Sequence, residues 1–232
     1  MTKKKESIRD YRFSDGILKQ KADDIASSVT RDITQFNTRG VTADTVTAFE
    51  TLAQEFDDLP TDEEAQGDVS DATEIKDAAA EALKVKIRTI RTMAQNKWGD
   101  GAAKYRSFGF EGMDDMNDSD LHRLGKRVGR RATANLAALE SEGLTEDMIT
   151  ALGTANTTFD DAIDAMEDKV KDRDLSTQSR VDKGNACYKE LVRLCNIGKD
   201  LWAARDEAKY NDYVIYNTPG GTAPSEPPPP GS

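Results

Sequence analysis

The chain has 232 residues, of which 37% are hydrophobic, 32% charged and only 6% aromatic, and its formal net charge is −11. This composition is typical of long, solvent-exposed helices and disfavours an enzyme with a thick interior. The negative charge disfavours nonspecific nucleic-acid binding, because that binding depends on Lys and Arg side chains that neutralise phosphates.

Neither a secretion signal nor a membrane span is predicted. The segment 1–13 contains three lysines at positions 3–5 but no apolar stretch of signal-peptide length. No later stretch approaches the roughly 20 apolar residues that a membrane helix needs. We therefore expect a protein that is cytoplasmic at synthesis and does not enter a membrane. Incorporation into a larger particle remains an open alternative.

Apolar residues recur every three or four positions through the first half of the chain, which is the period of an amphipathic helix. The first helix is expected over 15–39 and ends at Gly40. The second is expected over 42–59, where Pro60 and the acidic run after it interrupt or end the pattern. A third helix is expected over 71–98, followed by a glycine-rich stop.

The second half follows the same plan. Helices are expected over 118–140, 145–171 and 176–204. No stretch alternates in the manner of a strand, so the sequence predicts an all-α protein. Its six helices would form two up-down-up three-helix units.

The two halves also resemble each other residue by residue, at a spacing of about 103 positions, which indicates an internal duplication. We therefore divide the chain into a basic N-terminal arm (1–13), a first unit (14–110), a second unit (111–216) and a tail (217–232). The segments that correspond include Gly40–Asp44 with Gly143–Asp147, Phe56–Asp58 with Phe159–Asp161, and Trp98 with Trp202.

Each unit ends in an aromatic segment, which we call a strap. Tyr105, Phe108 and Phe110 close the first unit. Tyr210, Tyr213 and Ile215 occupy the corresponding places in the second. We expect both straps to fold back over the helices as a hydrophobic cover. The tail after them is rich in Pro and Gly, so we expect it to be disordered, as a spacer or a weak docking motif.

Small residues recur on the inward side of corresponding helices. Ala22 and Ala26 in the first helix correspond to Gly125 and Gly129 in the fourth. A glycine inside an exposed helix costs about 1 kcal/mol relative to alanine, so we interpret these positions as places where a neighbouring helix approaches closely. The same interpretation applies to the glycines at 184 and 198.

No motif in the chain points to catalysis or metal binding. The single histidine, His122, has no second histidine to share a metal, and we expect it at the surface. The acidic stretch 113–120 lacks the glycine and glutamate of a calcium loop, so Asn117 or Asp118 is interpreted as a helix N-cap. We predict no catalytic, cofactor-binding or metal-binding residues.

The two cysteines, Cys187 and Cys195, lie eight positions apart on one expected helix. That spacing separates their Cα atoms by about 12 Å, which is too far for a disulfide. We expect both thiols to be reduced and to fill the core.

The fourth helix carries a local basic cluster within an acidic protein. Such a stripe is usually a solvated face whose charges pair with nearby carboxylates. The alternative is that it meets an acidic surface, such as the run 57–71, on another copy of the protein. The candidate interaction surface consists of Arg123, Lys126, Arg127, Arg130 and Arg131.

The segments 143–161, 190–199 and 209–213 together resemble an uncharacterised group of bacterial tandem-repeat helical proteins. The resemblance covers most of 13–216 and includes no catalytic motif. It implies an all-α duplicated fold and a bacterial-type origin, and the group carries no assigned activity.

These observations favour a non-catalytic structural or scaffolding protein, a subunit of a larger protein assembly whose partners include further copies of itself. Neither a cofactor nor a membrane is expected among its partners. The alternative is a helical-bundle binding protein or enzyme with a small-molecule pocket between the two repeat units. Nucleic-acid binding ranks third and would be confined to the fourth helix.

Overall fold

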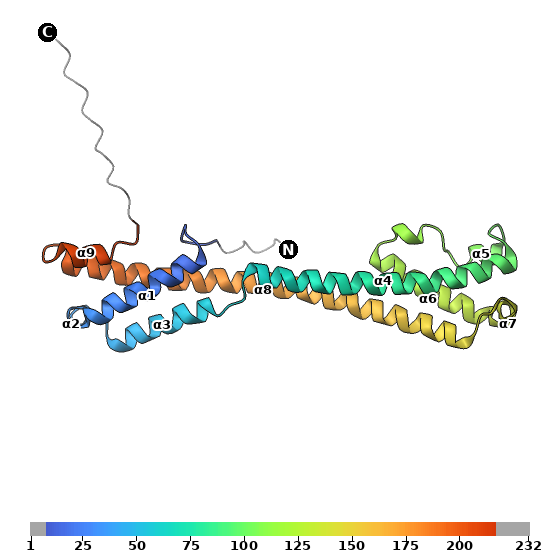
Figure 1. Cartoon of the computed structure of the whole chain (residues 1–232), viewed down its shortest axis with the longest axis horizontal. Coiled ribbons are helices and arrows are strands. Elements are labelled where there is room, and N and C mark those ends of the chain that lie inside the picture. The colour runs from blue at the N-terminus through green and yellow to red at the C-terminus, as the bar shows by residue number, and fades with distance from the viewer. Residues whose placement is uncertain (1–7, 217–232) are drawn as a thin grey trace, which may run out of the picture. The chain divides into compact units, whose positions relative to one another are not determined.

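The computed structural model describes residues 8–216, and every regular element in that range is a helix, so the all-α prediction is confirmed (Figure 1). Within that range, no helix is long and apolar enough to cross a lipid bilayer. The tail 217–232 lies outside the described residues, and so does the prediction of its disorder. The elements in chain order are α1 (Asp15–Arg31), α2 (Ile33–Asn37), α3 (Ala43–Asp57), α4 (Asp62–Trp98), α5 (Ala103–Arg106), the 3₁₀ helix η1 (Met113–Asp115), α6 (Asp118–Ala134), α7 (Leu136–Leu139), the 3₁₀ helix η2 (Glu140–Glu142), α8 (Glu146–Trp202) and α9 (Glu207–Asp212).

Helix α4 begins nine residues earlier than the sequence predicts, at Asp62 rather than Asp71. Thr61 and Glu64 form a capping box, in which each side chain accepts a hydrogen bond from the backbone N–H of the other. Acidic side chains in the first turn also favour the positive end of the helix dipole. The acidic residues from Asp62 onward therefore start a helix, and the four residues 58–61, which include Pro60, separate it from α3.

Helix α8 is one continuous helix of 57 residues, whereas the sequence predicts two helices over 145–171 and 176–204. The linking residues 172–175 contain neither Pro nor Gly, so no residue forces the helix to end there. The predicted first and fourth helices are conversely each divided, after Arg31 and after Ala134.

The chain forms two compact units, and each combines segments that are far apart in sequence. The first unit contains the described residues up to 59 together with those from 177 onward, and the second contains 60–176. These are not the contiguous units 14–110 and 111–216 that the sequence predicts. The difference arises from which helices share a core. Helix α4 shares a core with α6, and residues 177–202 of α8 share a core with α1 and α3.

The core of the first unit lies between α1, α3 and the C-terminal part of α8. Leu18, Val29, Phe49 and Leu191 are fully or almost fully buried there. Tyr11 is also buried, so the arm that the sequence predicts over 1–13 is packed against the core at this residue. The backbone N–H of the preceding residue, Asp10, donates a hydrogen bond to the Asn185 side chain on α8.

The strap that contains Tyr213, which the sequence assigns to the second unit, belongs to the first unit of the structure. Its tyrosine ring occupies a space next to a glycine. Tyr213 is fully buried, its ring centroid is 5.5 Å from that of Phe36, and its ring lies directly against Gly198 of α8. The cysteines Cys187 and Cys195 are free and buried in the same core, as predicted. Burial raises the pKa of their thiols to about 11 and about 12 respectively, so both remain protonated at neutral pH.

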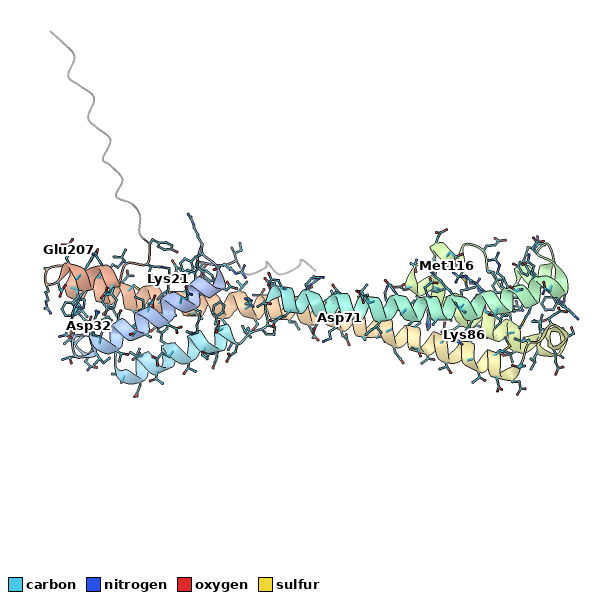
Figure 2. The ribbon with its side chains drawn as sticks, viewed as in Figure 1. Lys21, Asp32, Asp71, Lys86, Met116 and Glu207 are labelled. Carbon is cyan, nitrogen blue, oxygen red and sulfur yellow. The ribbon has the colours of Figure 1, made fainter. Side chains whose placement is uncertain are left out.

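One buried charge holds this strap in place. Asp32, at the end of α1, is 1% exposed and is labelled in Figure 2. It accepts hydrogen bonds from Arg31 Nη2 at 2.7 Å, Lys209 Nζ at 2.7 Å and the Tyr213 hydroxyl at 2.9 Å. Burial alone would raise the pKa of Asp32, but these hydrogen bonds outweigh burial and lower it to about 2.

The core of the second unit lies between α4, α6 and the first part of α8, with the strap 105–110 against it. Phe108 and Phe110 are buried and stacked, with centroids 5.1 Å apart. The expectation that the straps act as hydrophobic covers is therefore confirmed for the buried residues of both. Leu83, Leu124 and Phe159, one from each of the three helices, are almost completely buried beneath them.

Candidate protein-binding surface

The basic cluster lies on helix α6. The local sequence explains why this helix forms. Asn117 is the N-cap, as the sequence analysis allows, and its Oδ1 accepts a hydrogen bond from the Asp120 N–H at 2.9 Å. Asp118 and Asp120 place negative charge at the positive end of the helix dipole. The inward side of α6 is buried against the core of the second unit through Leu121, Leu124, Gly125, Val128 and Ala132.

All five basic side chains predicted as an interaction surface are exposed. At 3.6 residues per turn they fall on the side of α6 opposite its buried residues, so they form one ridge about 12 Å long. We call this ridge the basic face of α6. It consists of Arg123, Lys126, Arg127, Arg130 and Arg131.

The basic face lacks the neutralising partners that such a stripe usually has. Among residues 8–216, no carboxylate forms an ion pair with any of the five side chains, although ion pairs are frequent elsewhere. Lys76, for example, pairs with Asp118 at 2.7 Å, and Arg88 pairs with Asp114 at 2.6 Å. The charges of the basic face therefore remain available to another molecule.

The neighbouring strap restricts one of these side chains. The guanidinium of Arg127 lies against Gly109, where a Cβ atom would overlap its Nη1. Gly109 also has φ = +75°, a backbone conformation that other residues rarely adopt. The positive φ is the reason that a glycine is favoured at 109, and the Arg127 side chain occupies the space that a Cβ atom would take.

The contact of α6 with α8 fixes where the basic face lies. A Cβ atom at Gly125 would overlap the side-chain amide of Asn156, and a Cβ at Gly129 would meet Leu152 at 4.0 Å. The prediction of close helix approach is thus confirmed at Gly125, whereas Gly129 has ordinary contact. Since 125 faces 156 and 129 faces 152, α6 runs antiparallel to this part of α8.

His122 belongs to this contact and is not at the surface, so that prediction is wrong. Its side chain is only 12% exposed, and its Nδ1 lies 3.4 Å from Asp160 Oδ1 and 3.2 Å from Asn156 Nδ2. Asn156 is 5% exposed, and its Oδ1 has no hydrogen-bond partner among the described residues. In the described part of the chain, no three His, Cys, Asp or Glu side chains gather in the manner of a metal site.

Each unit also has a shallow groove between two of its helices. The groove in the first unit has a volume of about 510 Å³ and lies between α3 and α8, where Glu190 and Arg193 pair with each other at 2.6 Å. The second unit has two grooves between α4 and α8, one of about 340 Å³ beside Asp68 and Asp172 and one of about 180 Å³ beside Ile90 and Met148. None of these grooves includes a residue of the basic face, so the face is a separate feature.

No protein-family model, curated protein or solved structure matches this chain. Its function is therefore argued from the geometry of the molecule. A convex row of guanidinium and ammonium groups can bind carboxylates or phosphates, and Arg binds either group through two parallel hydrogen bonds.

Proposed function

We propose that this chain is a non-catalytic structural or scaffolding protein, a subunit of a larger protein assembly, and that the basic face of α6 binds an acidic protein surface. The observation that carries the proposal is the row of five exposed cations that pair with no carboxylate among residues 8–216. Because the chain as a whole has a net charge of −11, this row is a local site of attraction for carboxylates.

We also propose that the chain consists of two copies of one unit that exchange their third helices. Equivalent contacts support this interpretation. Asp15 at the start of α1 pairs with Arg180 at 2.8 Å, and Asp118, at the corresponding place in α6, pairs with Lys76 at 2.7 Å. In each pair the aspartate comes from the first helix of one copy and the cation from the third helix of the other.

The ends of the two third helices support the same interpretation. Lys209 lies 4.1 Å from the centroid of the Trp202 ring, and Lys104 lies 5.5 Å from that of Trp98. Both tryptophans occupy the last position of a helix, and both lysines belong to the short helix that follows. Two copies of one unit are expected to form the same cation–π contact at the same helix end.

The duplication provides an internal control for the basic face. At the spacing of 103 residues, its five positions correspond to Gln20, Asp23, Asp24, Ser27 and Ser28 on α1. None of these is basic, yet α1 forms a helix with the same buried stripe. The fold of the unit therefore does not require cations there, which favours a role for them in binding.

The proposal predicts that the basic face determines the size of the particle in the cell. In a lysate of the source cells at low salt, the wild-type protein is expected to sediment well above its monomer mass of 25.5 kDa. A variant with Arg127→Gln, Arg130→Gln and Arg131→Gln, expressed from the same gene, is expected to sediment as a monomer. Density-gradient sedimentation with immunodetection measures both.

A matched variant removes three exposed cations elsewhere, through Arg12→Gln, Lys189→Gln and Arg205→Gln. It changes the net charge equally, so it should sediment with the wild type. Wild-type protein that sediments as a monomer at low salt would contradict the proposed function, and so would an α6 variant that stays in the heavy fractions.

A further inference from the structure

The second unit also has an acidic ridge. On α8, four aspartates recur at intervals of three or four residues, and all are exposed. They fall on the side of the helix opposite the buried Leu152 and Phe159, so they form a ridge about 16 Å long. We call it the acidic face of α8, and it consists of Asp161, Asp164, Asp168 and Asp172.

Most of this face also forms no ion pair, although Lys171 lies near enough to act on the charge of Asp164, and Lys169 on that of Asp172. Asp168 pairs with Lys171 at 2.7 Å. Asp161, Asp164 and Asp172 form no ion pair with any cation of residues 8–216. One turn beyond Asp172, Leu175 continues the same side of the helix and is 68% exposed, an apolar side chain at the end of a charged row.

The two faces cannot pair within one chain. Helix α6 lies beside residues 152–156 of α8 and runs antiparallel to it, with its N-terminus toward higher residue numbers of α8. Asp161 lies beside the first turn of α6, and residues 164–172 continue past its start. In addition, the basic face and the aspartates 161, 164 and 168 lie opposite the residues buried in the shared core, whereas Asp172 lies at the edge of a groove between α4 and α8.

We propose that the basic face of α6 on one copy binds the acidic face of α8 on a second copy. The proposal rests on the proposed function and names its partner. The argument is charge complementarity between two outward rows with the same helical spacing and similar length, about 12 Å and about 16 Å. Leu175 supplies an apolar contact at the end of the row.

Because this contact joins two different surfaces, it is heterologous. Each copy in a pair keeps one free basic face and one free acidic face, so a third copy can add in the same manner. Assembly therefore continues, as a ring if the rotation closes and as a filament if it does not. The contact is also sensitive to salt, since both faces are exposed.

The test uses two full-length variants and analytical ultracentrifugation at about 20 mM salt, where charges attract over a long distance. One variant neutralises the basic face through Arg127→Gln, Arg130→Gln and Arg131→Gln. The other neutralises the acidic face through Asp161→Asn, Asp164→Asn and Asp172→Asn. Each is expected to associate about tenfold more weakly than the wild type, because three exposed ion pairs are lost.

An equimolar mixture of the two variants gives the decisive result. Only the basic face of the acidic-face variant and the acidic face of the basic-face variant remain intact, so the mixture is expected to form dimers and no larger species. A control with Asp24→Asn, Asp44→Asn and Glu50→Gln removes three exposed carboxylates from the first unit and should assemble as the wild type does. All variants alter exposed residues, and circular dichroism checks that they remain helical.

The outcomes separate the two proposals. If the acidic-face variant assembles like the wild type, the partner is not this face, while the role of α6 in the cell remains open to its own test. If the purified wild type stays monomeric but the cellular particle depends on α6, the partner is another protein and this inference is overturned. Binding of duplex DNA that is lost only in the basic-face variant would also overturn it.

Discussion

Gly198→Ala is expected to destabilise the first unit by about 3 kcal/mol, because it introduces a methyl group into a filled core. An ideal Cβ atom at Gly198 would overlap three ring carbons of Tyr213. That ring is fully buried against Phe36, so it has no free space into which to move. Urea unfolding measures the effect, and a Trp98→Phe background leaves Trp202 of the first unit as the fluorescent reporter.

A second glycine on the same helix is the matched control. Gly153 is exposed, and nothing lies within 4 Å of the place where its Cβ would be. Gly153→Ala should therefore be neutral or stabilise the protein by up to about 1 kcal/mol, through helix propensity alone. If Gly198→Ala had the stability of the wild type, Tyr213 could not be packed as described.

Asp32→Asn is expected to destabilise the first unit by about 3 kcal/mol at neutral pH, because Arg31, Lys209 and Tyr213 would lose the charge that they share. The pKa of Asp32 is lowered to about 2 in the folded protein, against about 3.9 in an unfolded chain. This stabilisation is therefore complete above about pH 4 and is lost as the pH falls through about 2.

The pH dependence distinguishes this interpretation from a simple loss of packing. The difference in unfolding free energy between wild type and Asp32→Asn should decrease by about 2 to 3 kcal/mol between pH 5 and pH 2. Asp212 is the control, since it also pairs with Arg31 but is 42% exposed. Asp212→Asn should cost about 1 kcal/mol or less. A pH-independent difference for Asp32→Asn would contradict the account.

Local features of the fold could be predicted from sequence wherever a short segment determines them. The apolar stripe and the cap at Asn117 define α6, and the small residue at 125 indicates close packing. The free cysteines follow from helix geometry. Helix continuity at 172–175 was predicted wrongly, although no residue in that stretch disfavours a helix.

Long-range pairing could not be predicted in the same way. The internal similarity of the sequence predicts which residues correspond, but it gives no information on which helices pack together. Two of the relevant side chains are Asp32 and Tyr213, whose contact joins opposite ends of the sequence. Asn156 was missed and the exposure of His122 was mispredicted for the same reason, since their surroundings form only where α6 meets α8.

The basic face of α6 illustrates the limit of sequence reasoning about sites. Sequence alone identified its five residues and left open whether carboxylates of the same chain neutralise them. Only the structure shows that the five side chains lie on the outward side of α6, unpaired with any carboxylate of residues 8–216. The sequence analysis named a different acidic partner, the run 57–71, and did not identify the aspartates of α8 as a row.

The most direct test of the central claim is the reactivity of individual arginines toward phenylglyoxal, measured by peptide mass spectrometry at low and at high salt. At low salt, Arg123, Arg127, Arg130 and Arg131 should be protected, while Arg12 and Arg205 react freely. High salt should restore the reactivity of the α6 arginines, because it screens the contact. Equal reactivity of all six arginines at both salt concentrations would contradict a protein contact through the basic face.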